Sequence, residues 1–207
     1  MKKTTNGVLR AVPTQREQQR MTTRNRLFDL CVAEFHRIGV EKTRIRDVAL
    51  RAGVVAGTFY FHFPSKNHVL LELGNRLIAQ VVDQLPGSPT EPADLERLLN
   101  ALVEATIEVE EQFADRALFR AVVSSFQHPS VDVPVESIRL QVALRDCIAE
   151  LGTTAGEGAL SADELSTLIL TAYFGALLVG PDDPQERFAQ LQRTLLFFAR
   201  ALQTAEG

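Results

Sequence analysis

The 207-residue sequence contains little cysteine, proline or glycine. Its two cysteines, Cys31 and Cys147, stand alone within apolar patterns, which argues against a disulfide framework or a zinc site built from paired cysteines. The 9 prolines and 12 glycines gather between apolar runs, which favours long helices over a many-stranded β-sandwich. We therefore expect a mainly helical protein with reduced cysteines in its core.

The sequence also lacks a long apolar run. The longest uncharged stretch, residues 165–181, contains serine and threonine and falls short of the ~20 residues that cross a bilayer comfortably. Lys2 and Lys3 are followed by polar residues rather than by the apolar stretch of a signal peptide. We therefore expect a cytoplasmic protein that does not act at a membrane.

Motifs for catalysis or metal binding do not stand out. The four histidines show no metal-ligand spacing, and we find no nucleophile elbow, phosphate-binding glycine loop or pair of carboxylates. We therefore expect no enzymatic activity, no metal and no cofactor.

Charge is distributed unevenly along the chain, whose net charge is −4. Residues 1–66 hold 13 Lys and Arg against 5 Asp and Glu, a net charge of +8, whereas the remaining residues hold 9 against 21, a net charge of −12. Such asymmetry indicates that the first third approaches a polyanion, although a chance cluster of solvated charges would give the same count.

Apolar residues recur at helical spacing in nine segments. The expected helices cover residues 24–38, 43–52, 55–63, 66–85, 94–111, 113–126, 135–151, 162–179 and 184–203. Residues 1–21 are polar and basic without a sustained period, and we expect a flexible basic arm there. The pattern predicts an all-α fold.

The second and third segments are short and closely spaced. Thr43 is a good N-cap for the second, Ala49 is small enough for a close helix crossing, and Gly53 suits a tight turn. Two short helices joined in this way describe a helix-turn-helix, although the spacing alone is weak evidence.

Residues 43–66, TRIRDVALRAGVVAGTFYFHFPSK, closely resemble the DNA-binding domain of TetR-family (tetracycline-repressor-like) regulators. The match begins in the preceding segment, RLFDLCVAEFHRIGV, and fades at KNHVLLEL, so it covers about a quarter of the chain. The resemblance implies an N-terminal three-helix helix-turn-helix domain over residues 22–66. It further implies a C-terminal helical domain for effector binding and dimerisation over residues 67–207.

The resemblance also implies a DNA-binding surface. Thr43 and Arg44 would open the second helix and meet phosphate, and Arg46 would enter the groove, where arginine binds guanine through two hydrogen bonds. The next helix would present its side chains to DNA. The residues assigned to DNA binding are Thr43, Arg44, Arg46, Val55, Ala56, Gly57, Thr58, Tyr60, Phe61, His62 and Lys66.

The recognition segment departs from the family. Val55 and Ala56 stand where the family often has a polar N-cap and a basic residue. Phe61 replaces a commonly found tyrosine, which removes a phosphate-binding hydroxyl. We therefore expect specificity to depend on Arg44 and Arg46, on apolar contact with thymine methyl groups, and on DNA shape.

Each assignment has a structural alternative. We expect Phe59 and Phe63 in the core, and Tyr60 and Phe61 could pack there as well. His62 could bond backbone carbonyls at the helix end. The basic arm is either solvated or reaches the minor groove. For the whole chain, the alternative is a helical dimer whose helix-turn-helix has lost its affinity for DNA.

Dimerisation and effector binding follow from the resemblance. A homodimer would use the last two helices, with the interface residues Ala172, Gly175, Ala176, Phe188, Leu191, Leu195, Phe198 and Leu202. The central helices would enclose an effector pocket, whose aromatic candidates are Phe113, Phe119, Phe126 and Tyr173, unless these only pack the core. The implied function is a ligand-responsive transcriptional regulator, by analogy a repressor, which a small hydrophobic effector releases from its double-stranded DNA operator.

Overall fold

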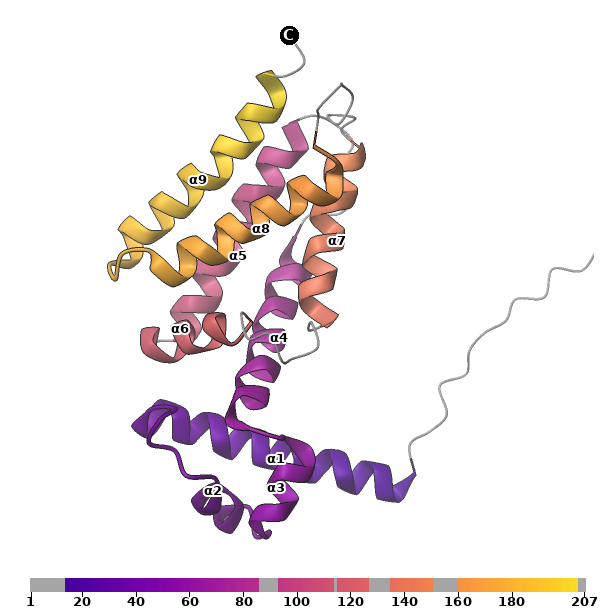
Figure 1. Cartoon of the computed structure of the whole chain (residues 1–207), viewed down its shortest axis with the longest axis vertical. Coiled ribbons are helices and arrows are strands. Elements are labelled where there is room, and N and C mark those ends of the chain that lie inside the picture. Colours follow the sequence, from indigo (N-terminus) through magenta and orange to yellow (C-terminus); the bar gives the residue numbers. More distant parts are fainter. Residues whose placement is uncertain (1–13, 86–92, 114, 127–134, 151–159, 205–207) are drawn as a thin grey trace, which may run out of the picture. The chain divides into compact units, whose positions relative to one another are not determined.

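A computed structural model describes residues 14–85, 93–113, 115–126, 135–150 and 160–204. Within these ranges every regular element is an α-helix, which confirms the expected all-α fold (Figure 1). The helices are α1 (Gln15–Ile38), α2 (Ile45–Arg51), α3 (Ala56–His62), α4 (Lys66–Gln84), α5 (Ala93–Phe113), α6 (Arg116–Ser125), α7 (Val135–Glu150), α8 (Ala162–Val179) and α9 (Pro184–Thr204). They form two compact units, Met1–Ser65 and Lys66–Gly207.

Helix α1 begins nine residues before the expected start at Arg24, so residues 15–21 are helical rather than part of a flexible arm. Thr14 caps the helix: its hydroxyl accepts from the Glu17 N–H, and the Glu17 carboxylate accepts from the Thr14 N–H at 2.7 Å. The segment is rich in Gln, Arg and Glu, which are good helix formers. It has no apolar stripe because its side chains face solvent, and the periodicity therefore missed it. Residues 1–13 lie outside the described residues.

The core of the first unit fixes the helix-turn-helix. Leu27, Cys31 and Phe35 of α1 have no exposed surface and lie among the buried side chains of α2 and α3. Gly53, between α2 and α3, has a φ of 71°, a conformation that glycine adopts without strain. Ala49 is buried in α2, as a close crossing requires.

A buried carboxylate links α1 to α2. Glu34 is 6% exposed, and its carboxylate accepts from Arg37 on the same helix and from Arg51 of α2 at 2.8 Å. The hydrogen bond from Arg37 is the main reason why the pKa of Glu34 lies below its usual range. The interaction therefore stabilises the unit while Glu34 is ionised.

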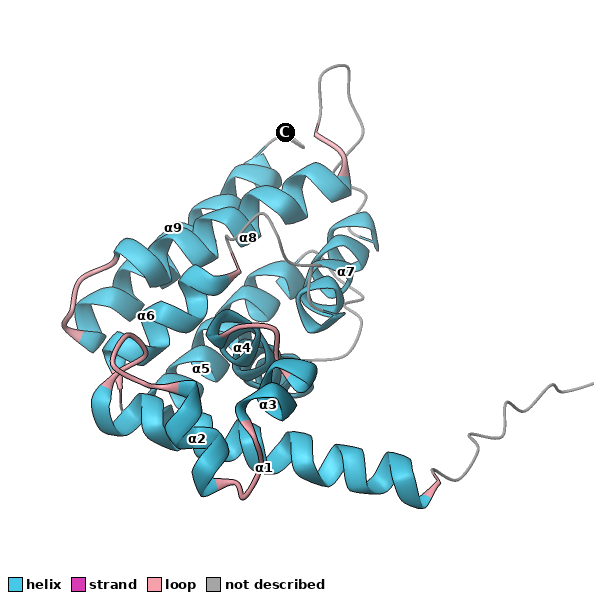
Figure 2. Ribbon diagram, turned by 60° about the horizontal axis from the view of Figure 1, so that its bottom comes forward, coloured by secondary structure: helices cyan, strands magenta, loops and turns pink. Residues whose placement is uncertain are grey.

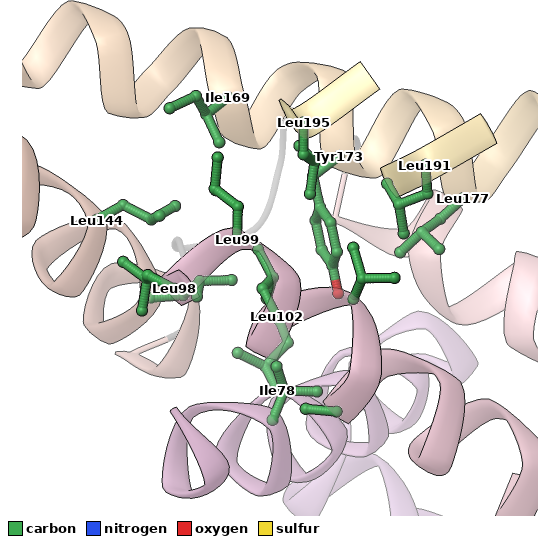
Figure 3. Packing of buried hydrophobic residues seen from close by; sticks show 14 of the residues in the cluster. Ile78, Leu98, Leu99, Leu102, Leu144, Ile169, Tyr173, Leu177, Leu191 and Leu195 are labelled. Carbon is green, nitrogen blue, oxygen red and sulfur yellow. The ribbon is translucent and has the colours of Figure 1, made fainter. Parts of the chain in front are cut away.

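Helices α4 to α9 form the second unit around one apolar core. Helix α8 packs against α7 and α9, while α4 packs against α5, α6 and α7 (Figure 2). Leu99 and Leu102 of α5, Ile169 of α8, and Leu191 and Leu195 of α9 converge in its centre without exposed surface (Figure 3). Helix α5 continues through Phe113, which was expected to open the next helix, because Asp115 caps α6 by accepting from the Leu118 N–H.

Among the described helices, α8 alone is long and apolar enough to cross a membrane by length and composition. Its Leu165, Ile169, Tyr173 and Leu177 are buried in the unit's core. One face of α8 therefore packs into the core of the second unit, while residues such as Leu168 and Val179 are exposed.

We predict that Glu34→Gln lowers the thermal unfolding midpoint at pH 7. Because the folded-state pKa of Glu34 is depressed, its stabilisation is present in full above the unfolded value of about 4.3. It is lost as the pH falls through the folded value. Circular dichroism melts between pH 7 and pH 3.5 should show that the difference in unfolding midpoint between the wild type and Glu34→Gln shrinks at the acidic end. Glu104→Gln, at an exposed position of α5, is the control; a gap independent of pH would contradict the prediction.

Candidate nucleic-acid interface and apolar pocket

Helix α3 presents an exposed face of three residues. Gly57, Tyr60 and Phe61 follow the i, i+3, i+4 spacing of one helix face; Tyr60 is 53% exposed and Phe61 is 66% exposed. Phe59 and Phe63 are buried on the other side of the chain, with ring centroids 5.7 Å apart. Tyr60 and Phe61 are therefore surface residues, and the alternative that they fill the core is wrong.

The start of α3 is apolar and open. Val55 is the N-cap residue, makes no side-chain capping bond and is 74% exposed. Ala56 and Thr58 are half-buried. The surface therefore offers methyl groups and a tyrosine hydroxyl, but few other hydrogen-bonding groups.

Helix α2 places Arg44 and Arg46 in exposed positions. Thr43 differs from the expectation: it is buried, and its hydroxyl donates to the Gly39 carbonyl at 2.8 Å. Arg44, not Thr43, is the N-cap residue of α2. Thr43 thus ties the end of α1 to the start of α2 and does not reach the surface.

His62 ends α3 and is half-buried. Burial lowers the pKa of its imidazole, and the nearby charges of Arg20 and Arg24 lower that pKa further. His62 is therefore a neutral hydrogen-bonding group at pH 7 in the free protein. Lys66, also assigned to DNA, is the first residue of α4 and belongs to the second unit.

Two arginines of α1 lie over aromatic rings at the end of α3. The Arg20 guanidinium carbon is 4.9 Å from the Phe61 ring centroid, and that of Arg24 is 4.6 Å from the Phe63 centroid. Arg20 lies in the segment expected to form a flexible arm, and the structure shows it in a helix instead. The four-residue spacing of the basic residues from Arg16 to Arg24 was the signal that could have identified this arrangement.

The second unit contains an apolar pocket between α4, α5, α6 and α8. The cavity between its lining side chains measures about 30 Å³. It brings together three of the four aromatic residues predicted for an effector site, Phe119, Phe126 and Tyr173. The fourth, Phe113, is not among the lining residues and instead contacts Phe119, with ring centroids 6.2 Å apart.

Most of the other lining residues are not singled out by the sequence, and two of them shape the pocket. Gly74 of α4 faces Phe126 so closely that an added Cβ would lie 2.4 Å from the ring, so only glycine leaves room for that aromatic side chain. Thr106 of α5 contributes a hydroxyl to an otherwise apolar wall. Neither residue stands out in sequence, because a glycine and a threonine within helices have many other roles.

The pocket's polar group has a defined hydrogen-bond direction. The Thr106 hydroxyl donates its one proton to the Leu102 carbonyl at 2.6 Å, so in its 2.7 Å contact with Tyr173 it accepts from the phenol. Tyr173 reaches from α8 toward α5 to make this bond (Figure 3). Burial raises the pKa of Tyr173 to about 12, so the phenol stays neutral. The Tyr173 oxygen can then accept a further hydrogen bond, but has no proton left to donate.

The structure corrects part of the predicted dimer surface. Phe188, Leu191 and Leu195 lie in the core of their own unit and are not available to a partner. Phe198 is partly buried against the same core, and the side chain of Leu202 lies outside the described residues.

The rest of the predicted dimer surface lies on α8, and both α8 and α9 also expose large apolar residues that were not predicted. Ala172, Gly175 and Ala176 are half-buried, and a Cβ added at Gly175 would meet no atom within 4 Å. Val179 of α8 and Phe197 of α9 are large apolar residues that are 82% and 69% exposed.

The fold and the site define a class: an all-α helix-turn-helix protein whose second helical unit holds an apolar pocket. Residues 27–73 match the bacterial regulatory proteins of the tetR family. This match spans the helix-turn-helix and agrees with the resemblance of this segment to TetR-family DNA-binding domains.

The chain is also similar in sequence to a bacterial regulator over part of its length. The chain is 31% identical over 77 residues to an uncharacterised HTH-type transcriptional regulator, YvdT, of Bacillus subtilis strain 168. That match covers 37% of this chain and 40% of YvdT, less than half of the relative's length.

Two solved structures share the fold over most of the chain. The TetR-family repressor FadR of Thermus thermophilus, solved with lauroyl-CoA, has a TM-score of 0.60 at 24% identity, covering 84% of this chain and 92% of FadR. A TetR regulator from Rhodococcus sp. RHA1 has a TM-score of 0.61 at 18% identity, covering 86% of this chain and 96% of that protein.

Proposed function

We propose that the protein is a transcriptional repressor that binds operator DNA as a homodimer and is released by a small apolar effector. The observation that carries the proposal is the exposed face of α3, where Gly57, Tyr60 and Phe61 stand clear of the core in the strongly basic third of the chain. A short helix with an open face suits the major groove. Repression follows the description of the Thermus FadR as a repressor.

The chemistry of this face favours a particular mode of DNA recognition. Arg46 is an exposed arginine of α2 and would bind a guanine edge, while Val55 and Ala56 suit apolar contact with thymine methyl groups. Because the face has few hydrogen-bonding groups, DNA shape would supply part of the specificity. Residues 15–65 would form the DNA-binding domain, and a cytoplasmic location would give it access to DNA.

A homodimer would place two α3 helices on half-sites about 34–36 Å apart. The exposed apolar side chains of α8 and α9 support this proposal. Leu168, Ala172, Gly175 and Val179 follow helical spacing along α8, and Phe197 lies exposed on α9. Exposed apolar side chains gathered on two neighbouring helices indicate a protein contact. We therefore assign the interface to these residues in place of Leu191 and Leu195.

The pocket of the second unit would hold the effector, and its cavity of about 30 Å³ would widen as the effector enters. Its wall is apolar apart from the Thr106–Tyr173 pair, whose free hydrogen-bonding capacity is an acceptor. An effector would therefore be an uncharged, mainly apolar molecule with one hydrogen-bond donor. A coupling free energy of about 1–3 kcal/mol between effector and DNA binding would suffice for release.

We predict that Arg46→Ala weakens binding to an operator selected from random duplexes by about 1–3 kcal/mol and leaves binding to random DNA nearly unchanged. Fluorescence anisotropy at several salt concentrations measures both affinities. Equal losses on the two DNAs would reassign Arg46 to a phosphate. If the wild-type protein binds no DNA duplex even at low salt, the proposed function is refuted, and a helical dimer without DNA affinity is favoured instead.

We predict that Phe197→Glu shifts the protein toward the monomer, because it places a charge in the proposed interface. Sedimentation equilibrium measures the change in the association constant. Leu50→Glu, at a position 78% exposed on α2, is the matched control and should leave association unchanged. A Phe197→Glu protein that associates like the wild type would remove α9 from the interface.

We predict that 1-octanol releases operator DNA at lower concentration than 1-methoxyoctane, because only the alcohol donates a hydrogen bond. A hydrogen bond of typical strength corresponds to about a fivefold preference. The double variant Tyr173→Phe, Thr106→Val removes both the phenol oxygen and the threonine oxygen that the phenol covers, so the two probes should then act equally. An ether as potent as the alcohol on the wild type would contradict the assigned hydrogen-bond direction.

A further inference from the structure

The first turns of α1 carry a row of arginines. Arg16, Arg20 and Arg24 follow one another at intervals of four residues, which places them on one face of the helix about 6 Å apart along its axis. Arg16 and Arg20 are exposed, and neither pairs with an acidic side chain in the part of the chain that the structure describes. Glu17, the acidic residue between them, is engaged in the cap with Thr14.

The exposed ring of Phe61 holds Arg20 in place. The guanidinium stacks 4.9 Å from the ring centroid, on the face of α3 that the core leaves open. Such stacking restrains the guanidinium without occupying its N–H donors, which point outward in the plane of the group. Arg20 therefore presents an oriented, charged set of donors beside the exposed face of α3.

We propose that Arg20, positioned by Phe61, binds the sugar-phosphate backbone of the DNA that α3 reads, and that Arg16 extends this contact along the strand. This inference rests on the proposed function. Phosphate is the partner of matching chemistry, because it is anionic and accepts from arginine through two parallel hydrogen bonds.

The cap on α1 supports this role. Residues 15–21 have exposed side chains and add no buried surface to the core, yet the chain folds them into helix behind a complete capping box. Since they extend a helix that is already packed, they need no new nucleation. Their placement fixes the arginine row relative to α3, which a flexible arm would not do.

The test compares Arg20→Ala with Arg26→Ala, an exposed arginine on the same helix, about 240° around its axis from Arg20. Binding is measured by fluorescence anisotropy on the selected operator and on a random duplex between about 50 and 300 mM salt, a range over which phosphate contacts weaken strongly. Arg20→Ala should weaken binding about tenfold on both DNAs at the lowest salt. It should also reduce the slope of log K against log salt by about 1, whereas Arg26→Ala should leave the slope unchanged.

A double-mutant cycle tests the role of Phe61. If the ring positions Arg20, Phe61→Leu should reduce the effect of Arg20→Ala by about two- to fivefold. Circular dichroism melts of each variant check that the fold persists. Independent effects of the two substitutions would overturn the positioning by Phe61.

Failure of this inference is distinguishable from failure of the proposed function. A wild-type protein that binds its operator while Arg20→Ala keeps the full salt slope would overturn the phosphate contact alone. A loss confined to the operator would also overturn it, because it would identify a base contact instead. Absence of DNA binding by the wild type would remove the proposed function itself.

Discussion

The burial of Phe59 and Phe63 is the constraint on which the DNA-facing surface depends. The two rings lie four residues apart and pack together in the core. The Phe28 ring also packs there, with its centroid 6.4 Å from that of Phe63. Because residues of one helix turn point in successive directions, fixing these two side chains inward leaves Tyr60 and Phe61 no place but the surface. Apolar burial of this kind costs several kcal/mol to undo, far more than one exposed contact can contribute. The rotation of α3 is therefore set by the core and not by DNA.

This constraint explains which parts of the site the sequence could predict. The spacing of Phe59 and Phe63 and the turn at Gly53 can be read directly from the chain, and they place α3 and its exposed residues correctly. Thr43 could not be placed in this way, because its hydroxyl has two competing uses: capping the helix that follows or bonding the carbonyl that precedes. The structure chooses the Gly39 carbonyl, a tertiary outcome that local pattern does not determine.

Helix α1 and helix α9 show two further limits of sequence patterns. An apolar stripe reports burial, so the solvent-facing start of α1 gave no signal, although the Thr14 and Glu17 cap was present in the sequence. The apolar stripe on α9 correctly indicates a buried face, but it does not say which surface covers that face. Leu191 and Leu195 pack inside their own unit. Periodicity identifies a buried face without saying whether the same chain or another copy covers it.

The two units differ in how they would use charge. Residues 1–66 carry the positive charge, and the arginines of α1 lie against aromatic rings that restrain them, so attraction to a polyanion is coupled to a defined orientation. The remaining residues carry a net charge of −12, which a polyanion repels. Their pocket, in contrast, is almost free of charge, and its polar pair is locked by a hydrogen-bond chain from Tyr173 through Thr106 to the Leu102 carbonyl. Recognition of a neutral effector there would thus depend on shape and on a single acceptor, and so would be largely insensitive to the salt that governs DNA binding.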